Sequence, residues 1–294
     1  MNLRDLHYLV TVAEVRSFIH AAEQCFISQP TLSTQIKKME ETLGVVLFER
    51  NNKKVIPTEI GEQVIASARR ILLEMDTIKQ LAQNAQNPLA GNFRLGAFPT
   101  LASYVFPGLV ALIKSELPAL RLILVEEKTE VLLAQLRQGK LDATLLALPV
   151  YDEHLVCRKL FDDEFLLAVA QDNPLAQLER IDQNDLYQQQ ILLLDEGHCL
   201  RDQALQVCKI NAANEQQDVR ATSLETLRQM VHAGTGITFM PQIALPKNAD
   251  GIAYIPFAAP APKRVIGLVW RKTSAREAVL EIVSRLVIRL SDLA

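Results

Sequence analysis

Residues 28–44 of the chain read SQPTLSTQIKKMEETLG. Ser28 is a residue type that caps helix N-termini, and Pro30 falls in the first turn, where a missing N–H is tolerated. Apolar side chains then recur at spacings of four, three and four, and Gly44 ends the pattern. These apolar positions are Leu32, Ile36, Met39 and Leu43. The segment therefore predicts an amphipathic helix with one buried face and one polar face.

The sequence on either side of this helix predicts a winged helix-turn-helix. Residues 3–15 have the periodicity of an amphipathic helix, and a second short helix is expected at residues 19–25. After Gly44, residues 47–50 and 53–57 flank an Asn51-Asn52 turn, a pattern typical of a short β-hairpin, or wing.

The polar face of the helix at residues 28–44 suits DNA. Gln, Ser, Thr and Lys side chains contact base edges and phosphates, and a helix N-terminus favours a phosphate. We expect DNA contacts from Ser28, Gln29, Pro30, Thr31, Ser33, Gln35, Lys37 and Lys38, and from the wing residues Arg50, Lys53 and Lys54. The alternative is an ordinary solvated helix face, which the helix-turn-helix, wing and following helix in series make less favoured.

A long helix is predicted from Thr58, its cap, to about Gln86. Its apolar residues are spaced close to a heptad pattern, which favours pairing with a partner helix. They are Ile60, Val64, Ala68, Ile71, Met75, Ile78, Ala82 and Ala85. We interpret residues 59–87 as a linker and dimerisation helix, and residues 87–91, Asn-Pro-Leu-Ala-Gly, as the connection to the next domain.

From Asn92 the pattern becomes α/β. Strands are expected at residues 93–98, 120–126, 141–148, 165–170, 191–194, 237–240 and 265–270, and helices from Pro99, at 129–139 with Thr129 as cap, at 224–233 and at 277–290. Alternating strands and helices predict parallel sheets in two Rossmann-like subdomains, with ligands bound at the carboxyl ends of strands. The expected domains are 1–58, 59–87 and 88–294, the last split into subdomain I (91–162 and 267–294) and subdomain II (163–266).

Composition limits the classes of protein. The 294 residues are 49% hydrophobic with a net charge of −3, so any DNA site must be a local patch. The sequence shows neither a transmembrane-length apolar run nor a signal-peptide core, so we expect a cytoplasmic protein. Four cysteines are too few for a structural disulfide framework, and cytoplasmic disulfides are mostly catalytic or redox-sensing.

Cys199 and Cys208 are nine residues apart. In a helix this is roughly 13 Å along the axis, whereas a disulfide needs Cα atoms within about 7 Å. Bonding them therefore requires the helix to unwind, as expected of a redox switch. A position at a helix N-terminus near Arg201 would lower the Cys199 thiol pKa and favour attack by peroxide. From the residues alone, two ordinary buried cysteines and a structural His198 remain the default alternative.

Residues 1–86 resemble the N-terminal region of LysR-type transcriptional regulators. The resemblance rests on Ala21-Ala22-Glu23, residues 28–33, Ile36, Glu40, Leu43-Gly44-Val45, Leu47-Phe48-Glu49-Arg50, Thr58 and Gly61. It implies tetramers of winged-helix dimers joined by a linker helix. It also implies an effector domain of two periplasmic-binding-protein-like subdomains.

Residues 197–204 with Cys208, residues 221–228 and residues 236–238 are similar to the peroxide-sensing members of that family. The similarity implies that Cys199 is the peroxidatic cysteine and Cys208 the resolving one. It also implies a peroxide pocket formed by Thr100, Thr129, His198 and Arg264. A plain N-cap is the alternative for Thr129, a turn residue for Thr100 and a solvated charge for Arg264.

These features predict a bacterial, nucleoid-associated activator of antioxidant genes. Its expected partners are promoter DNA, hydrogen peroxide, RNA polymerase, further copies of itself, and glutaredoxin or thioredoxin as reductant, without a cofactor, metal or membrane. The main alternative is a LysR-type regulator of a small organic effector. A thiol peroxidase is disfavoured because an enzyme does not need a winged helix, and a metal sensor because no CxxC or HxxxH cluster exists.

Overall fold

A computed structural model describes residues 1–51, 54–186, 189–195, 200–201, 203–205, 214–221 and 223–292. The chain divides into two compact units, Met1–Gln83 and Asn84–Ala294. Within the described residues, no helix is both long and apolar enough to cross a membrane.

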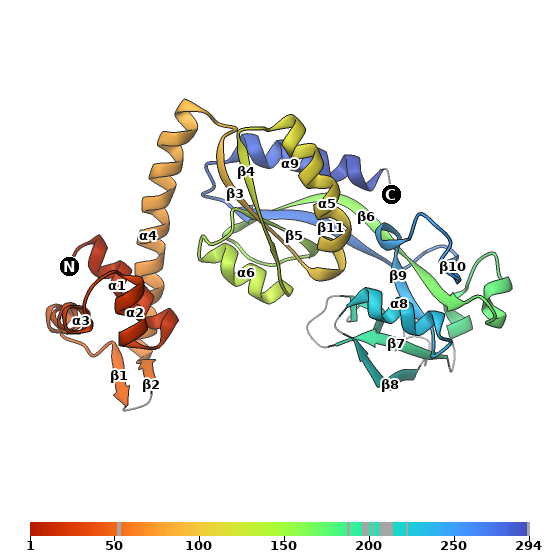
Figure 1. The fold of residues 1–294 in the computed structure, drawn as a ribbon, viewed down its shortest axis with the longest axis horizontal. Coiled ribbons are helices and arrows are strands. Elements are labelled where there is room, and N and C mark those ends of the chain that lie inside the picture. The colour runs from red at the N-terminus through yellow and green to blue at the C-terminus, as the bar shows by residue number, and fades with distance from the viewer. Residues whose placement is uncertain are drawn as a thin grey trace. The chain divides into compact units, whose positions relative to one another are not determined.

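The first unit is the predicted winged helix-turn-helix followed by a long helix (Figure 1). Its elements are α1 (Leu3–Val15), α2 (Phe18–Gln24), α3 (Gln29–Leu43), β1 (Phe48–Asn51), β2 (Lys54–Pro57) and α4 (Glu59–Gln86). The two strands pair antiparallel, with Asn51 opposite Lys54 at the tip of the wing. The expected helices and hairpin are thus confirmed to within about one residue.

Side chains from α1, α3 and α4 form the core of this unit. Leu9, Leu32, Ile36 and Ile65 are completely buried in it. The prediction that Leu43 is also inward is wrong, because Leu43 lies in the last turn of α3 and is 38% exposed. Gly61 lets α4 approach the wing, since a Cβ there would lie 2.1 Å from the Leu47 carbonyl oxygen.

Part of the apolar stripe of α4 is already buried within the first unit. Val64 and Ala68 pack against the core of their own winged helix, whereas the heptad spacing favoured a partner helix for the whole stripe. Ile60, Ile71 and Ile78 remain exposed. The part of the stripe left for a partner helix therefore includes Ile71 and Ile78, beyond the winged helix.

The second unit is α/β. Its elements are β3 (Gly91–Ala97), α5 (Pro99–Glu116), β4 (Leu120–Glu126), α6 (Thr129–Arg137), β5 (Ala143–Leu148), β6 (Leu155–Ala170), the 3-10 helices η1 (Pro174–Gln177) and η2 (Gln183–Leu186), β7 (Gln190–Leu194), β8 (Asn214–Ala221), α8 (Leu224–His232), β9 (Thr238–Pro241), the 3-10 helix η3 (Gln242–Ala244), β10 (Ile252–Pro256), β11 (Lys263–Arg271) and α9 (Glu277–Ser291).

The main sheet is mixed, not parallel. In the described chain its order is β10-β6-β11-β5-β3-β4, with β9 also paired to β6, and β7 and β8 form a separate pair. β3 pairs in parallel with β4 and β5, whereas β11 runs antiparallel to β5 and β6. The expectation of parallel sheets fails at β11, which lies between β5 and β6 and runs antiparallel to both. It also fails at β6, whose other partners, β9 and β10, are antiparallel as well.

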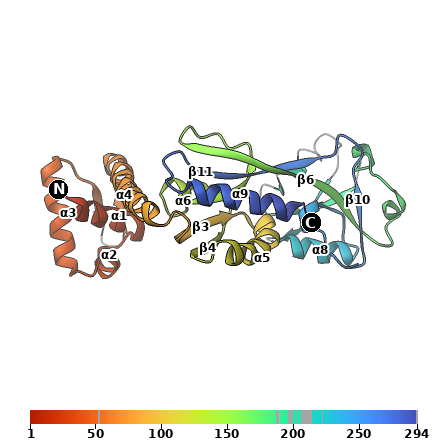
Figure 2. The same cartoon turned by 90° about the horizontal axis from the view of Figure 1, so that it is seen from above.

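Helices cover both faces of the sheet, and two apolar cores result. Figure 1 shows α5 and α9 on one side of β3, β4, β5 and β11 and α6 on the other; Figure 2 shows α9 lying along the same group of strands. One core contains Leu95, Leu109 and Val283, and the other contains Leu167, Leu192 and Phe239. β6 runs from one core to the other, so it is far longer than the predicted strand at 165–170.

Candidate functional site

The recognition helix α3 begins with a well-formed cap. Ser28 is the N-cap, its side chain accepts the Thr31 backbone N–H at 3.3 Å, and Pro30 lies in the first turn. The Ser28 and Thr31 hydroxyls lie 2.7 Å apart, and Gln29 Nε2 donates to Ser33 Oγ at 3.2 Å. Short polar side chains are therefore ordered at the end of the helix, where they can meet DNA.

Most of the predicted DNA-contact residues at α3 face solvent. Ser28, Gln29, Pro30, Thr31, Lys37 and Lys38 are exposed, and Ser33 and Gln35 are half-buried. Arg50 belongs to β1 and Lys54 to β2, and Lys53 lies outside the described residues. The exposure of these α3 residues is what a DNA-reading surface needs.

Glu40 contacts the start of the wing, a role that its place in the family motif does not predict. Its Oε1 accepts the backbone N–H groups of Leu47 at 2.8 Å and of Phe48 at 3.3 Å. The carboxylate therefore joins the recognition helix to the start of the wing. The signal in the sequence is an acidic residue four positions before the helix-ending Gly44, which by itself does not reveal the contact.

Thr100 and Thr129 occupy equivalent positions on neighbouring parallel strands. Ala97 of β3 is the register partner of Glu126 of β4, and each threonine follows its strand residue by three positions. Both lie in the first turn of the next helix, α5 or α6. Since the carboxyl ends of parallel strands meet at one sheet edge, both threonines belong to the edge where ligands are expected.

Thr129 is not the N-cap of its helix, contrary to the sequence prediction. The cap is Lys128, and it makes no side-chain capping hydrogen bond. Thr129 Oγ1 is instead buried without a hydrogen-bond partner among the described atoms. A buried hydroxyl without a partner is costly, so this oxygen is suited to bind a small polar ligand.

Arg264 is buried, not a solvated charge. Only 1% of the residue is exposed, and its guanidinium lies 5.2 Å from the centre of the Phe98 ring. Its Nη1 donates to Thr100 Oγ1 at 2.9 Å and its Nη2 to the Thr100 carbonyl oxygen at 3.1 Å. The structure thus brings together two of the predicted pocket residues that are 164 positions apart.

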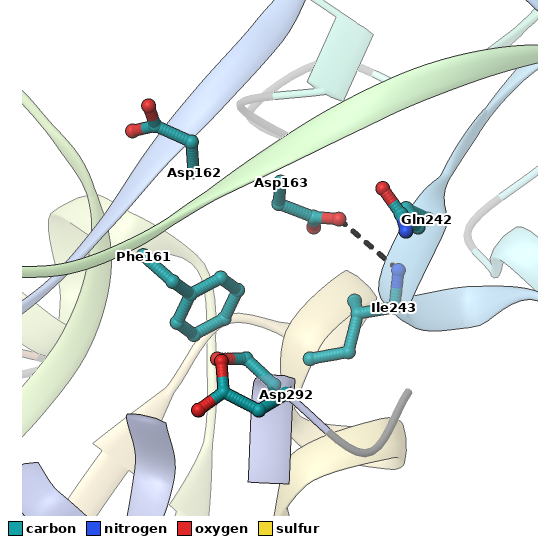
Figure 3. A pocket seen from close by; sticks show the side chains of 7 residues that line it. Phe161, Asp162, Asp163, Gln242, Ile243 and Asp292 are labelled. Atoms are coloured by element: carbon teal, nitrogen blue, oxygen red, sulfur yellow. Dashed lines mark hydrogen bonds between the residues drawn. The ribbon is translucent and has the colours of Figure 1, made fainter. Parts of the chain in front are cut away.

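The carboxylate that balances Arg264 belongs to Asp163, which sequence analysis missed. Arg264 Nε donates to Asp163 Oδ2 at 2.8 Å, and the two residues are cross-strand partners of β11 and β6. Asp163 Oδ1 also accepts the backbone N–H of Ile243 at 3.1 Å, at the wall of a cavity of about 130 Å³ (Figure 3). Asp162-Asp163-Glu164 looks like a solvated acidic run, and nothing local to it indicates that the middle residue is buried.

The predicted redox residues Cys199 and Cys208, and His198, lie outside the described residues. Of the residues between Cys199 and Cys208, the structure describes 200, 201 and 203–205, which are helical. Leu200 and Ala204 are buried against β7. Arg201 Nη1 donates to the Leu194 carbonyl oxygen at 3.0 Å.

The two cysteines that the structure describes, Cys25 and Cys157, are free thiols. Cys25 Sγ lies 3.9 Å from His7 Nδ1, and Cys157 Sγ donates to the Val150 carbonyl oxygen at 3.7 Å. Partial burial, together with the nearby Asp152 carboxylate, raises the pKa of Cys157, which lowers its thiolate fraction at neutral pH.

Both units match family models. Residues 3–62 match the bacterial regulatory helix-turn-helix protein, lysR family, and residues 86–289 match the LysR substrate binding domain. The second match alone covers more than half of the chain.

Characterised relatives are similar along almost the whole chain. The DNA-binding transcriptional dual regulator OxyR of Escherichia coli is 44% identical over 276 residues, which is 93% of this chain and 90% of that protein. The hydrogen peroxide-inducible genes activator of Haemophilus influenzae is 42% identical, covering 93% and 92%.

Solved structures agree. A full-length OxyR variant from Pseudomonas aeruginosa has a TM-score of 0.81 and 37% identity, covering 98% of this chain and 94% of that one. The oxidized form of OxyR has a TM-score of 0.63 and 40% identity, covering 70% and 98%. The predicted fold, an N-terminal helix-turn-helix followed in the sequence by an α/β domain, is confirmed. The chain belongs to the LysR family of DNA-binding transcriptional regulators, not to an enzyme family.

Proposed function

We propose that this chain senses hydrogen peroxide and activates antioxidant genes in response. The observation that carries the proposal is the 44% identity to E. coli OxyR over 93% of the chain, combined with Cys199 and Cys208 in the segment that resembles a peroxide-sensing loop. The buried Arg264 and Thr100 and the unpartnered Thr129 hydroxyl support it, since together they offer charge and hydrogen bonds to a small polar ligand.

The chemistry is a two-step thiol oxidation. The Cys199 thiolate attacks one peroxide oxygen, so that an S–O bond forms, the O–O bond breaks and the departing oxygen takes a proton and leaves as water. The Cys208 thiol then attacks the sulfenic sulfur, which forms the disulfide and releases a second water. Thr100, Thr129, His198 and Arg264 form the peroxide pocket in the first step, with Arg264 acting through its hydrogen bonds to Thr100. Because the disulfide cannot span an intact helix, the segment between the cysteines refolds.

The refolding changes DNA binding through the tetramer that the chains form. Residues 1–58 bind promoter DNA, residues 59–87 pair two chains, and residues 88–294 carry the sensor. Two such dimers form a tetramer, and the disulfide changes its conformation, the spacing of its DNA-binding domains and its contact with RNA polymerase. Glutaredoxin or thioredoxin reduces the disulfide, and the protein acts at the nucleoid in the cytoplasm.

The first test is thiol mapping by mass spectrometry after brief exposure of the full chain to micromolar hydrogen peroxide. The proposal expects a rapid disulfide between Cys199 and Cys208 that is absent in Cys199→Ser. Cys157 is the internal control, because the elevated pKa of its thiol predicts slower oxidation. If Cys25 or Cys157 reacted while Cys199 and Cys208 stayed free, the redox proposal would fail.

A second candidate is a LysR-type regulator of a small organic effector. The observation that favours it is a cavity of about 320 Å³ between the first turns of α5 and α8, whose lining includes Ser103, Tyr104, Glu126, Ser223 and Glu225. Its size is within the range of small-molecule sites. A metabolite that stabilised wild type and Cys199→Ser equally and saturably in a thermal-shift screen would support this candidate over the peroxide sensor.

A further inference from the structure

The hydrogen bonds around Arg264 have only one possible direction. Arginine has five N–H donors and no acceptor, whereas a threonine hydroxyl has one hydrogen to donate and two lone pairs. In the bond between Arg264 Nη1 and Thr100 Oγ1, the arginine must therefore be the donor. The hydroxyl hydrogen of Thr100 is left to point elsewhere, and no other hydrogen bond of this hydroxyl involves the residues that the structure describes.

The orientation of Arg264 is fixed by Asp163. Asp163 Oδ2 lies 2.8 Å from both Nε and Nη2 of Arg264, and neither side chain is more than 1% exposed. The side-chain direction of Asp163 is itself fixed, since its other oxygen accepts the Ile243 N–H at 3.1 Å (Figure 3). With Nε and Nη2 held in this way, the planar guanidinium must present Nη1 to Thr100.

We propose that Asp163 is a positioning residue of the peroxide pocket. It holds Arg264 so that Nη1 donates to Thr100 Oγ1, which leaves the hydrogen of the Thr100 hydroxyl free to be donated to the bound peroxide. This inference rests on the proposed function. Asp163 acts on the bound peroxide through Arg264 and Thr100. The hydrogen bond from Thr100 strengthens as negative charge develops on peroxide oxygen during attack by the Cys199 thiolate. The S–O bond forms as the O–O bond breaks, sulfur is oxidised, peroxide is reduced, and the departing oxygen is protonated to water.

The location of the pair adds a second consequence. Asp163 and Arg264 are directly opposite each other on β6 and β11, and β6 contributes residues to both apolar cores. From there, Arg264 reaches Thr100 in α5 and Asp163 reaches Ile243 in η3. The direction in which the Thr100 hydroxyl donates its hydrogen therefore depends on the relative positions of α5, β6, β11 and η3.

The test is a double-mutant cycle on the full chain with Asp163→Asn and Thr100→Val. The measured quantity is the rate constant of Cys199 oxidation by hydrogen peroxide, obtained by rapid quenching and mass spectrometry. Either single substitution is expected to slow the reaction on the order of 10- to 100-fold. In the Thr100→Val background, Asp163→Asn should slow it by less than about twofold, because the group through which Asp163 acts is gone.

Two further measurements separate positioning from general damage. Alkylation of Cys199 by iodoacetamide between pH 5 and 9 should be the same in wild type and Asp163→Asn, since alkylation needs the thiolate but not the hydroxyl. Asp162→Asn is the matched control, because Asp162 is the adjacent carboxylate of β6, is exposed, and pairs with Lys159 and Lys263. It should react with peroxide at the wild-type rate.

The inference is overturned if the two substitutions slow oxidation additively, if Asp163→Asn matches wild type, or if iodoacetamide alkylation falls in parallel with oxidation. Should Asp163→Asn not fold, Arg264→Lys replaces it in the cycle, since a lysine amine cannot bond Asp163 and Thr100 with the fixed fork of a guanidinium. Failure of the proposed function looks different: wild-type Cys199 would then react with peroxide no faster than Cys157.

Discussion

The Glu40 carboxylate of the recognition helix accepts the backbone N–H of Leu47 at 2.8 Å, across the turn that leads into the wing. Leu47 is completely buried, so water cannot replace Glu40 as the acceptor for this N–H. The same oxygen also accepts the N–H of Phe48. The Glu40 side chain therefore joins the recognition helix to the wing, and we expect their joint use on DNA to depend on it.

Replacing Glu40 by alanine is expected to lower both stability and DNA affinity. Two N–H groups lose their acceptor, and we expect a loss of about 1–3 kcal/mol in the free energy of unfolding. Urea denaturation and fluorescence anisotropy with promoter DNA measure the two effects. Glu41→Ala is the control, because in the part of the chain that the structure describes Glu41 makes only an exposed pair with Lys37, and its loss should change stability by less than about 0.5 kcal/mol. Equal effects of the two substitutions would contradict this role of Glu40.

Thr129→Val should make the protein more stable and its peroxide response slower. The substitution replaces a buried hydroxyl without a partner by a methyl group of similar size, which should raise the unfolding free energy by about 1 kcal/mol. It also removes a hydrogen-bonding group from the proposed pocket. Thermal unfolding and the rate of Cys199 oxidation give the two readouts.

Thr144→Val is the matched control for Thr129→Val. Thr144 Oγ1 is likewise buried without a partner among the described atoms, but Thr144 lies within β5 and not at the sheet edge. It should gain stability with an unchanged oxidation rate. A wild-type oxidation rate in Thr129→Val would remove Thr129 from the pocket.

Charged substitutions at Ile71 and Ile78 should weaken assembly. Both side chains are exposed on α4, Ile78 to 66%, while Ala68 nearer the winged helix is already buried within the unit. Ile71→Glu with Ile78→Glu is expected to raise the dissociation constant of the dimer at least about tenfold, as burial of two apolar anchors is lost. Light scattering after size-exclusion chromatography measures the mass.

Lys79→Glu provides the comparison for this experiment. Lys79 neighbours Ile78 but, among the described side chains, makes only an exposed ion pair with Asp76, so its replacement should leave the mass unchanged. An unchanged mass in the double isoleucine variant would show that α4 is not the dimerisation element.

Acid should destabilise the sensor domain partly through Asp250. Burial alone would raise the pKa of Asp250, but hydrogen bonds from Tyr254 and Arg228 outweigh it and hold the pKa below its ordinary value. A carboxylate whose pKa is lowered on folding stabilises the protein above its unfolded pKa of about 4, and this stabilisation is lost as the pH falls through the folded pKa.

Asp250→Asn tests this contribution. The variant should be less stable than wild type at pH 7 by about 1–3 kcal/mol, because hydrogen bonds to a charged group are lost. The difference in unfolding free energy should shrink as the pH falls below about 4. A difference that stayed constant between pH 7 and pH 3 would show that Asp250 contributes nothing to acid sensitivity.

The local pattern of the sequence was sufficient for most elements. The apolar spacing of Leu32, Ile36 and Met39, with Ser28 and Gly44 as caps, placed α3, and the same logic placed α4 and the strand β4. It missed β10, which ends in a proline, and β8, which is mostly polar. These strands depend on neighbours that are distant in the sequence, and propensity cannot supply that information.

The sequence by itself determined the winged helix, the linker helix and the identity of Thr100, Thr129 and Arg264 as pocket candidates, because helix periodicity, caps and family motifs are local signals. Only the tertiary structure decided that the sheet is mixed, that Arg264 is buried on Thr100, and that Asp163 holds it from 101 residues away. The physical reason is that Arg and Asp side chains are usually exposed to solvent. Whether it becomes a buried, oriented charge depends on the cross-strand register of β6 and β11, which no local pattern encodes.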